Sequence, residues 1–179
     1  MTYFKDLSAY WYHGVGMARR GRSPSLNVGW LSAAHAFAQA EPSEALLDRL
    51  WRFCKVSVAQ MRGIHECELC SVEAFRAEHK GETLLLGTSE IRVFAPEGGV
   101  YAAPTLIFHY VKAHLYLPPA EFLAALYNGP CPPEPAYFHR LEELELEWTR
   151  QLRNAEGVSG AAPGCARVER RAIGAFSTV

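Results

Sequence analysis

The sequence predicts an α+β fold, with a small antiparallel sheet and three to four helices packed on it. Apolar residues recur at helical spacing after Pro42, and again in the segments that follow Pro104 and Pro119. Between the first two of these segments, residues 83–103 alternate apolar and polar side chains around a glycine-rich turn. Strand and helix patterns therefore occupy separate parts of one chain, as in α+β proteins.

The first helix is predicted to begin after Ser43. The Ser43 hydroxyl suits the free N–H groups of a helix start, and Glu44 suits the positive first turn. The apolar stripe consists of Leu46, Leu47, Leu50, Trp51 and Cys54. We therefore expect one buried helix face, on which Cys54 is a small core residue.

Residues 83–103 are predicted to form two or three antiparallel strands. Ile91 and Val93 alternate with Arg92, and Gly98 and Gly99 mark a tight turn.

Three prolines are predicted to delimit the next helices. Pro104 suits the first position of a helix, where its missing N–H costs nothing. That helix must stop near Leu117, because Pro118 disfavours helical geometry in the residue before it. Pro119 then starts another helix, which ends at Asn128 and the following glycine.

The C-terminal part begins with the proline-rich break GPCPPEP. A last helix is predicted over residues 134–154, with an apolar stripe of Tyr137, Leu141, Leu144, Trp148 and Leu152. The Gly, Ala and Pro content after it predicts a loose tail. The expected organisation is a core over residues 1–128, a C-terminal amphipathic helix packed on it over 129–156, and a tail over 157–179.

Bulk composition narrows the function classes. The chain has 179 residues, 49% hydrophobic and 21% charged, which favours one domain with a substantial core. Its formal net charge is −1, so it lacks the basic excess of a dedicated nucleic-acid binder. The first residues do not resemble a signal peptide, and no apolar run approaches the roughly 18 residues of a membrane span. The chain has five cysteines, an odd number that cannot all pair within one chain. Together these features point to the reducing cytoplasm, where cysteines more often bind metal or stay free than form disulfides.

The residues with the strongest chemical signal are Cys67 and Cys70, in the stretch GIHECELC. A C-x2-C pair on a turn can direct two thiolates at one metal ion, a spacing common in structural zinc sites. Thirty-eight residues further on, His109 and His114 form an H-x4-H pair that suits the second half of such a site. The sequence therefore predicts one Cys2His2 zinc-type site, with Zn²⁺ as the cofactor. The ion would link the CELC turn to the helix that contains His109 and His114.

The two histidines present a geometric difficulty. Residues five apart on an ideal helix point about 140° apart around the axis, so both cannot face one ion from a regular helix. The helix must loosen near His114, and Pro118 with Pro119 demands an ending at about that place.

Other interpretations of the CELC stretch remain open. The two cysteines could pack, or could cycle as a dithiol, although Glu68 between them would raise their thiol pKa values. His65 could be an alternative ligand or could donate a hydrogen bond to one. The other histidines, His79 among them, have no ligand-type neighbours in the sequence.

The chain also resembles a family of uncharacterised bacterial proteins. The likeness rests on NVGWL (27–31), RGIHECELC (62–70), EIRV (90–93) and YAAPTLIFHYVKAHLYLPPAEF (101–122). By this resemblance, Cys67, Cys70, His109 and His114 match recurring Cys and His positions of the family. The resemblance implies no activity.

For function, a closed set of four ligands without an evident nucleophile–base pair favours a non-enzymatic interaction or regulatory module. One alternative is a hydrolase-like zinc enzyme with Cys67, Cys70 and one histidine as ligands, and with His65 or Glu66 as acid or base.

A second alternative is a nucleic-acid-binding zinc protein, using Arg19, Arg20, Arg22 and the arginines of the tail. No partner is identified by the sequence. Another protein is the class considered, and the aromatic start Tyr10, Trp11 and Tyr12 is either a contact surface or part of the core.

Overall fold

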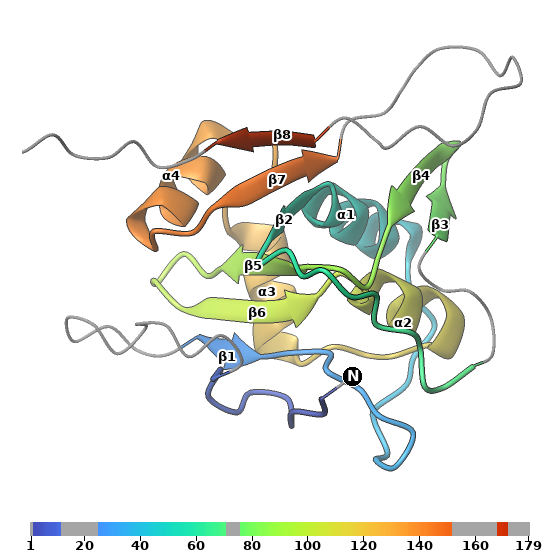
Figure 1. Cartoon of the computed structure of the whole chain (residues 1–179). Helices are drawn as coiled ribbons and strands as arrows, with labels where there is room; N and C mark the ends of the chain where they lie inside the picture. The colour runs from blue at the N-terminus through green and yellow to red at the C-terminus, as the bar shows by residue number, and fades with distance from the viewer. Residues whose placement is uncertain (1, 12–24, 71–75, 152–167, 172–179) are drawn as a thin grey trace, which may run out of the picture.

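Figure 1 shows the computed structural model of the chain, which describes residues 2–11, 25–70, 76–151 and 168–171. Within these residues it has four helices, a six-stranded mixed sheet and a separate two-stranded antiparallel sheet. The predicted α+β class is therefore confirmed.

The large sheet has the strand order β1-β6-β5-β2-β7-β8. Its strands are β1 (Leu26–Asn27), β2 (Val56–Val58), β5 (Glu90–Phe94), β6 (Val100–Pro104), β7 (Trp148–Gln151) and β8 (Val168–Arg171). All neighbours pair antiparallel except β1, which runs parallel to β6. The second sheet pairs β3 (Arg76–His79) with β4 (Glu82–Leu85).

The predicted hairpin is present as β5 and β6, which pair from Glu90 with Pro104 to Phe94 with Val100. The sheet is wider than predicted, because short strands from distant parts of the chain join both sides of this hairpin. Every residue of β5 and β6 is buried, so the hairpin is covered on both faces.

The helices are α1 (Glu44–Cys54), α2 (Ile107–His114), α3 (Ala120–Asn128) and α4 (Pro135–Glu143). The α1 start is as predicted, since Ser43 Oγ accepts a hydrogen bond from Leu46 N–H at 3.2 Å. Cys54 is fully buried, as expected of a core residue. Among the described residues, none of these helices has the length and apolar character needed to cross a membrane.

Pro104 does not open a helix, contrary to the prediction. It is the last residue of β6, and the next N–H, that of Thr105, still bonds the Ser89 carbonyl oxygen at 2.9 Å. The chain therefore follows the sheet past the proline, and α2 begins only at Ile107. The following helix begins as predicted, with Pro119 at the N-cap of α3.

The predicted helix over residues 134–154 is wrong beyond Glu143. Glu145 adopts a left-handed φ of 56°, and residues 148–151 form β7 against β2. The sequence carries the strand signal as well, because Leu144, Leu146 and Trp148 alternate with acidic residues. Within the segment predicted as a loose tail, Val168–Arg171 pair with β7 as β8.

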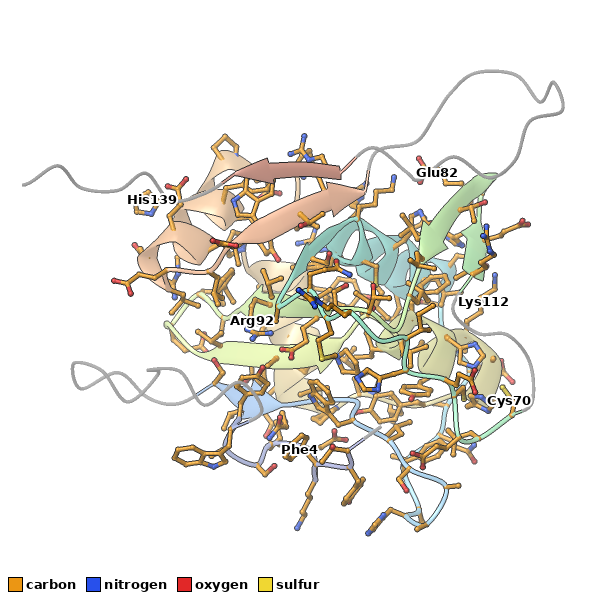
Figure 2. The ribbon with its side chains drawn as sticks, in the orientation of Figure 1. Phe4, Cys70, Glu82, Arg92, Lys112 and His139 are labelled. Atoms are coloured by element: carbon orange, nitrogen blue, oxygen red, sulfur yellow. The ribbon has the colours of Figure 1, made fainter. Side chains whose placement is uncertain are left out.

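A buried charged cluster lies on β5 near the middle of the large sheet, where Figure 2 labels Arg92. The Arg92 guanidinium contacts the Glu90 carboxylate at 2.6 Å, and the side chains are 2% and 0% exposed. Tyr10 Oη lies 2.8 Å from each Glu90 carboxylate oxygen, and Arg92 stacks over the Tyr10 ring. Tyr10 is therefore a core residue rather than part of an exposed surface, whereas Trp11 is 68% exposed.

Candidate metal centre

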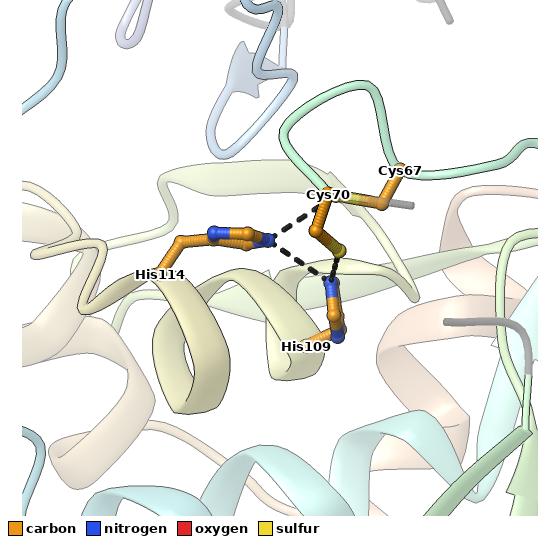
Figure 3. Close-up of side chains that lie close together, drawn as sticks. All are labelled: Cys67, Cys70, His109 and His114. Carbon is orange, nitrogen blue, oxygen red and sulfur yellow. Dashed lines mark hydrogen bonds between the residues drawn. The ribbon is translucent and has the colours of Figure 1, made fainter. Parts of the chain in front are cut away.

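The structure brings Cys67, Cys70, His109 and His114 together, although two come from a loop and two from α2 (Figure 3). Their four ligand atoms all lie within 4.8 Å of one another. Cys67 Sγ is 3.3 Å from His114 Nε2, and Cys70 Sγ is 3.5 Å from His109 Nε2. The two Nε2 atoms are 3.2 Å apart.

These spacings match the edges of a coordination tetrahedron. With Zn–N of about 2.05 Å and Zn–S of about 2.3 Å, tetrahedral geometry places two nitrogens about 3.3 Å apart and a sulfur and a nitrogen about 3.6 Å apart. The N···N distance of 3.2 Å and the S···N distances of 3.3 and 3.5 Å lie close to these values. The four side chains are therefore placed to hold one metal ion.

Helix α2 ends directly after His114, the second of the two histidines. The Leu115 N–H bonds the Tyr110 carbonyl five residues back, not four, and Leu115 has a left-handed φ of 58°. This bond closes a wide turn from Tyr110 to Leu115, so the regular helix ends at the second histidine. The loosening predicted near His114 is thus present, although it lies ahead of Leu117.

Hydrogen bonds between residues 38–40 and residues 114–117 fix the position of His114. The Gln39 side-chain amide donates to the His114 carbonyl oxygen at 2.9 Å. The Leu117 N–H bonds the Ala38 carbonyl, and the Ala40 N–H bonds the Leu115 carbonyl, each at 2.9 Å. The segment before α1 therefore holds the C-terminal end of α2, a contribution that no sequence pattern indicated.

The cysteine loop is held against the other side of the site by the chain around Gly87. The His65 N–H donates to the Gly87 carbonyl at 2.8 Å, and the Met61 N–H donates to the Thr88 carbonyl at 2.7 Å. At the metal side, the Leu69 N–H lies 3.4 Å from Cys67 Sγ, as expected for a turn that stabilises a thiolate. The His65 side chain is not part of the four-residue group.

Burial sets the protonation of the site. It lowers the pKa of His109 to about 4, with the neighbouring His114 as a smaller cause, and it also lowers the pKa of His114. Both imidazoles are therefore neutral near pH 7, which is the form that binds metal. Burial raises the pKa of the Cys67 thiol, so a bound cation must displace its proton.

Gly87 is required for the close approach of the cysteine loop. Its φ is +78°, and a Cβ added there would lie 2.4 Å from the His65 carbonyl oxygen. We expect Gly87→Ala to destabilise the protein by about 2 kcal/mol or more and to weaken metal binding, since the loop must move outward. Urea unfolding and a metal-competition titration measure the two effects.

Gly98→Ala is the matched control for Gly87→Ala. Gly98 also has a positive φ, of +102°, but a Cβ there would meet nothing within 4 Å. The Gly98→Ala variant should lose stability through backbone strain while keeping its metal affinity. Equal losses of metal affinity in the two variants would contradict the role assigned to Gly87.

A second group of ligand-type side chains consists of Glu44, Asp48 and His79, which the sequence did not connect. His79 Nε2 lies 2.7 Å from one Asp48 oxygen, and Lys80 Nζ lies 2.5 Å from the other. The Lys80 hydrogen bond, with a smaller one from His79, lowers the pKa of Asp48. Because both Asp48 oxygens face nitrogen donors at hydrogen-bond distance, Asp48 of α1 is engaged by His79 at the end of β3 and by the adjacent Lys80.

Several residues that the sequence singled out lie outside the described part of the chain. They are Tyr12, Arg19, Arg20 and Arg22, and one of the tail arginines, Arg167. The nucleic-acid-binding alternative, which uses the arginines, therefore stays a prediction. So does the role of the complete aromatic start as a contact surface.

Comparison with known proteins adds one finding. A family model described as a domain of unknown function, DUF7919, matches residues 2–127. The comparisons with curated proteins and with solved structures found no match. The matched range contains all four clustered Cys and His residues and ends within α3. It spans well over half of the 179 residues, so the chain belongs to the DUF7919 family.

Proposed function

We propose that this chain is a zinc-binding protein in which the ion ties the loop of Cys67 and Cys70 to helix α2. One observation carries the proposal: four ligand atoms from two distant segments converge at the spacing of a tetrahedral site. Such convergence is hard to attribute to packing, because two imidazoles and two thiols gain little from one another without a cation between them.

The donor set favours zinc among the common metals. Two thiolates with two imidazoles form a tetrahedral S2N2 set, which suits Zn²⁺, whereas magnesium and calcium prefer oxygen ligands. Thiolates also bind more strongly than carboxylates to borderline-soft cations.

The role that this geometry supports best is structural. Catalytic zinc usually has three protein ligands and a water, whereas four protein ligands fill a tetrahedral ion. We therefore favour a non-enzymatic interaction or regulatory module over a hydrolase-like enzyme. We assign it to the cytoplasm, a reducing compartment that keeps thiols available for metal.

Metal analysis tests the proposal. The purified protein is expected to hold one zinc ion per chain by elemental analysis, and Cys67→Ser and His114→Ala should each hold far less. His139→Ala is the matched control, because His139 lies on α4 with a side chain that is 71% exposed. Wild-type protein without zinc after zinc-supplemented purification would refute the proposal.

Cobalt substitution separates a structural ion from a catalytic one. A Co²⁺ ion with four protein ligands should give the intense visible bands of tetrahedral S2N2 coordination, unchanged by added azide or cyanide. Bands that shift on adding either anion would show an open position and would favour the enzyme alternative.

A further inference from the structure

We propose that the metal centre is a redox switch, in which a peroxide oxidises Cys67 and Cys70 to a disulfide and thereby releases the ion. This inference rests on the proposed zinc-binding function and adds its regulation. It follows from the placement of the two sulfurs in one loop, their unequal exposure, and their contacts with the two histidines of α2.

The two sulfurs are suited to join one another. They lie in one turn with two residues between them, and both belong to the group whose ligand atoms are within 4.8 Å of one another. The other described cysteines are engaged elsewhere. Cys54 Sγ donates to the Thr105 carbonyl, and Cys131 is fully buried beside Pro132. Oxidation of the Cys67–Cys70 pair therefore needs no movement of another helix or strand.

The two cysteines differ in access to solvent. Cys67 is 7% exposed, whereas Cys70 is partly exposed and lies next to α2 in Figure 2. A small oxidant from solvent meets Cys70 first. Cys67 is then the thiolate close enough to complete the reaction.

The reaction balances with a peroxide as the oxidant. The Cys70 thiolate attacks one oxygen of hydrogen peroxide, the O–O bond breaks, and Cys70 sulfenic acid and hydroxide form. The Cys67 thiolate then attacks the Cys70 sulfur, the S–O bond breaks, and a second hydroxide leaves as the disulfide forms. Two thiolates are oxidised by two electrons, and one peroxide is reduced.

Loss of both thiolates removes half of the donor set. The two imidazoles on α2 remain, but a disulfide sulfur is a poor ligand for Zn²⁺, so the ion is released. The contacts of Cys67 with His114 and of Cys70 with His109 are lost with the ion. The loop keeps its backbone bonds to Gly87 and Thr88, so oxidation removes these two contacts with α2 while the loop stays attached to the segment between β4 and β5.

Peroxide titration of the zinc-loaded full chain tests the switch. The Cys165→Ser background removes the cysteine that lies outside the described residues. Released zinc is measured with a colorimetric chelator, and the linkage is mapped by peptide mass spectrometry. We expect one zinc released per Cys67–Cys70 disulfide, unmodified Cys54 and Cys131, and recovery of zinc binding after dithiothreitol and added zinc. A sulfenic-acid trap should label Cys70 in preference to Cys67.

Three outcomes would overturn the switch while leaving zinc binding intact. They are retention of zinc with both thiols reduced, release with sulfinic acid on Cys70 in place of a disulfide, and trapping at Cys67 first. Cys70→Ser in the same background serves as the mass control, since it cannot form this disulfide whether or not it binds zinc. Absence of zinc from the untreated protein would instead refute the proposed function itself.

Discussion

Removal of the metal is expected to lower the melting temperature of this protein by about 8–16 °C. A ligand at about 1,000 times its Kd stabilises the folded state by about 4 kcal/mol, and a domain of this size shifts by about 2–4 °C per kcal/mol. The ion should reach that level, because its four ligands are already at tetrahedral spacing in the folded chain. Calorimetry with and without a strong zinc chelator measures the shift.

Cys67→Ser provides the control for the chelator. This variant should melt near the temperature of the chelated wild type and should not respond to chelator or to added zinc. His139→Ala should keep the wild-type response, since its side chain lies on the exposed face of α4. A wild-type protein that holds one zinc and melts at the same temperature after chelation would show that the ion contributes nothing to stability.

Arg92→Met is expected to destabilise the protein by about 3–5 kcal/mol, the usual cost of removing one partner from a buried ion pair. Arg92 and Glu90 are 2% and 0% exposed, and 2.6 Å separates their charged atoms. The substitution also removes the guanidinium that stacks over Tyr10. The bond from Tyr137 Oη to the Arg92 backbone carbonyl does not depend on the side chain. Urea unfolding measures the loss.

The double variant Glu90→Gln/Arg92→Met isolates the cost of the buried charge. It should regain about 2 kcal/mol or more of the stability lost in Arg92→Met, because no carboxylate is then left buried without its arginine. Lys55→Met is the surface control. Its pair with Glu82 is about one-third exposed on both sides, so its loss should cost less than about 1 kcal/mol. Equal costs for Arg92→Met and Lys55→Met would contradict the account of the buried pair.

The parts of the fold that the sequence predicted are those with local signals. Ser43 and the leucines after it predicted α1, and Gly98 with Gly99 predicted the turn between β5 and β6. The failures occur where pairing partners are distant in sequence. Strand β7 forms because β2 offers an edge about ninety residues earlier, and this distant partner decides between the helical and the alternating pattern, both of which residues 144–148 carry.

The candidate site shows the same division. Ligand type and spacing were sufficient to select Cys67, Cys70, His109 and His114, because metal chemistry restricts both. The residues that support the site escaped prediction, since Gln39 and Gly87 have ordinary identities and act through backbone contacts. His79 was missed for another reason: its partners Glu44 and Asp48 are about thirty residues away on a different element.

The order of the ligands along the chain bears on biosynthesis. Both candidate thiol ligands leave the ribosome before His109, the first histidine of the group, with 38 residues between Cys70 and His109, and both hairpins lie in that interval. Closing so long a segment carries an entropic cost that the intervening strands repay only when paired. The four candidate ligands are therefore not all available until the hairpins and α2 have been synthesised. Under the proposed zinc-binding function, stable binding of the ion would mark completed folding of this half of the molecule.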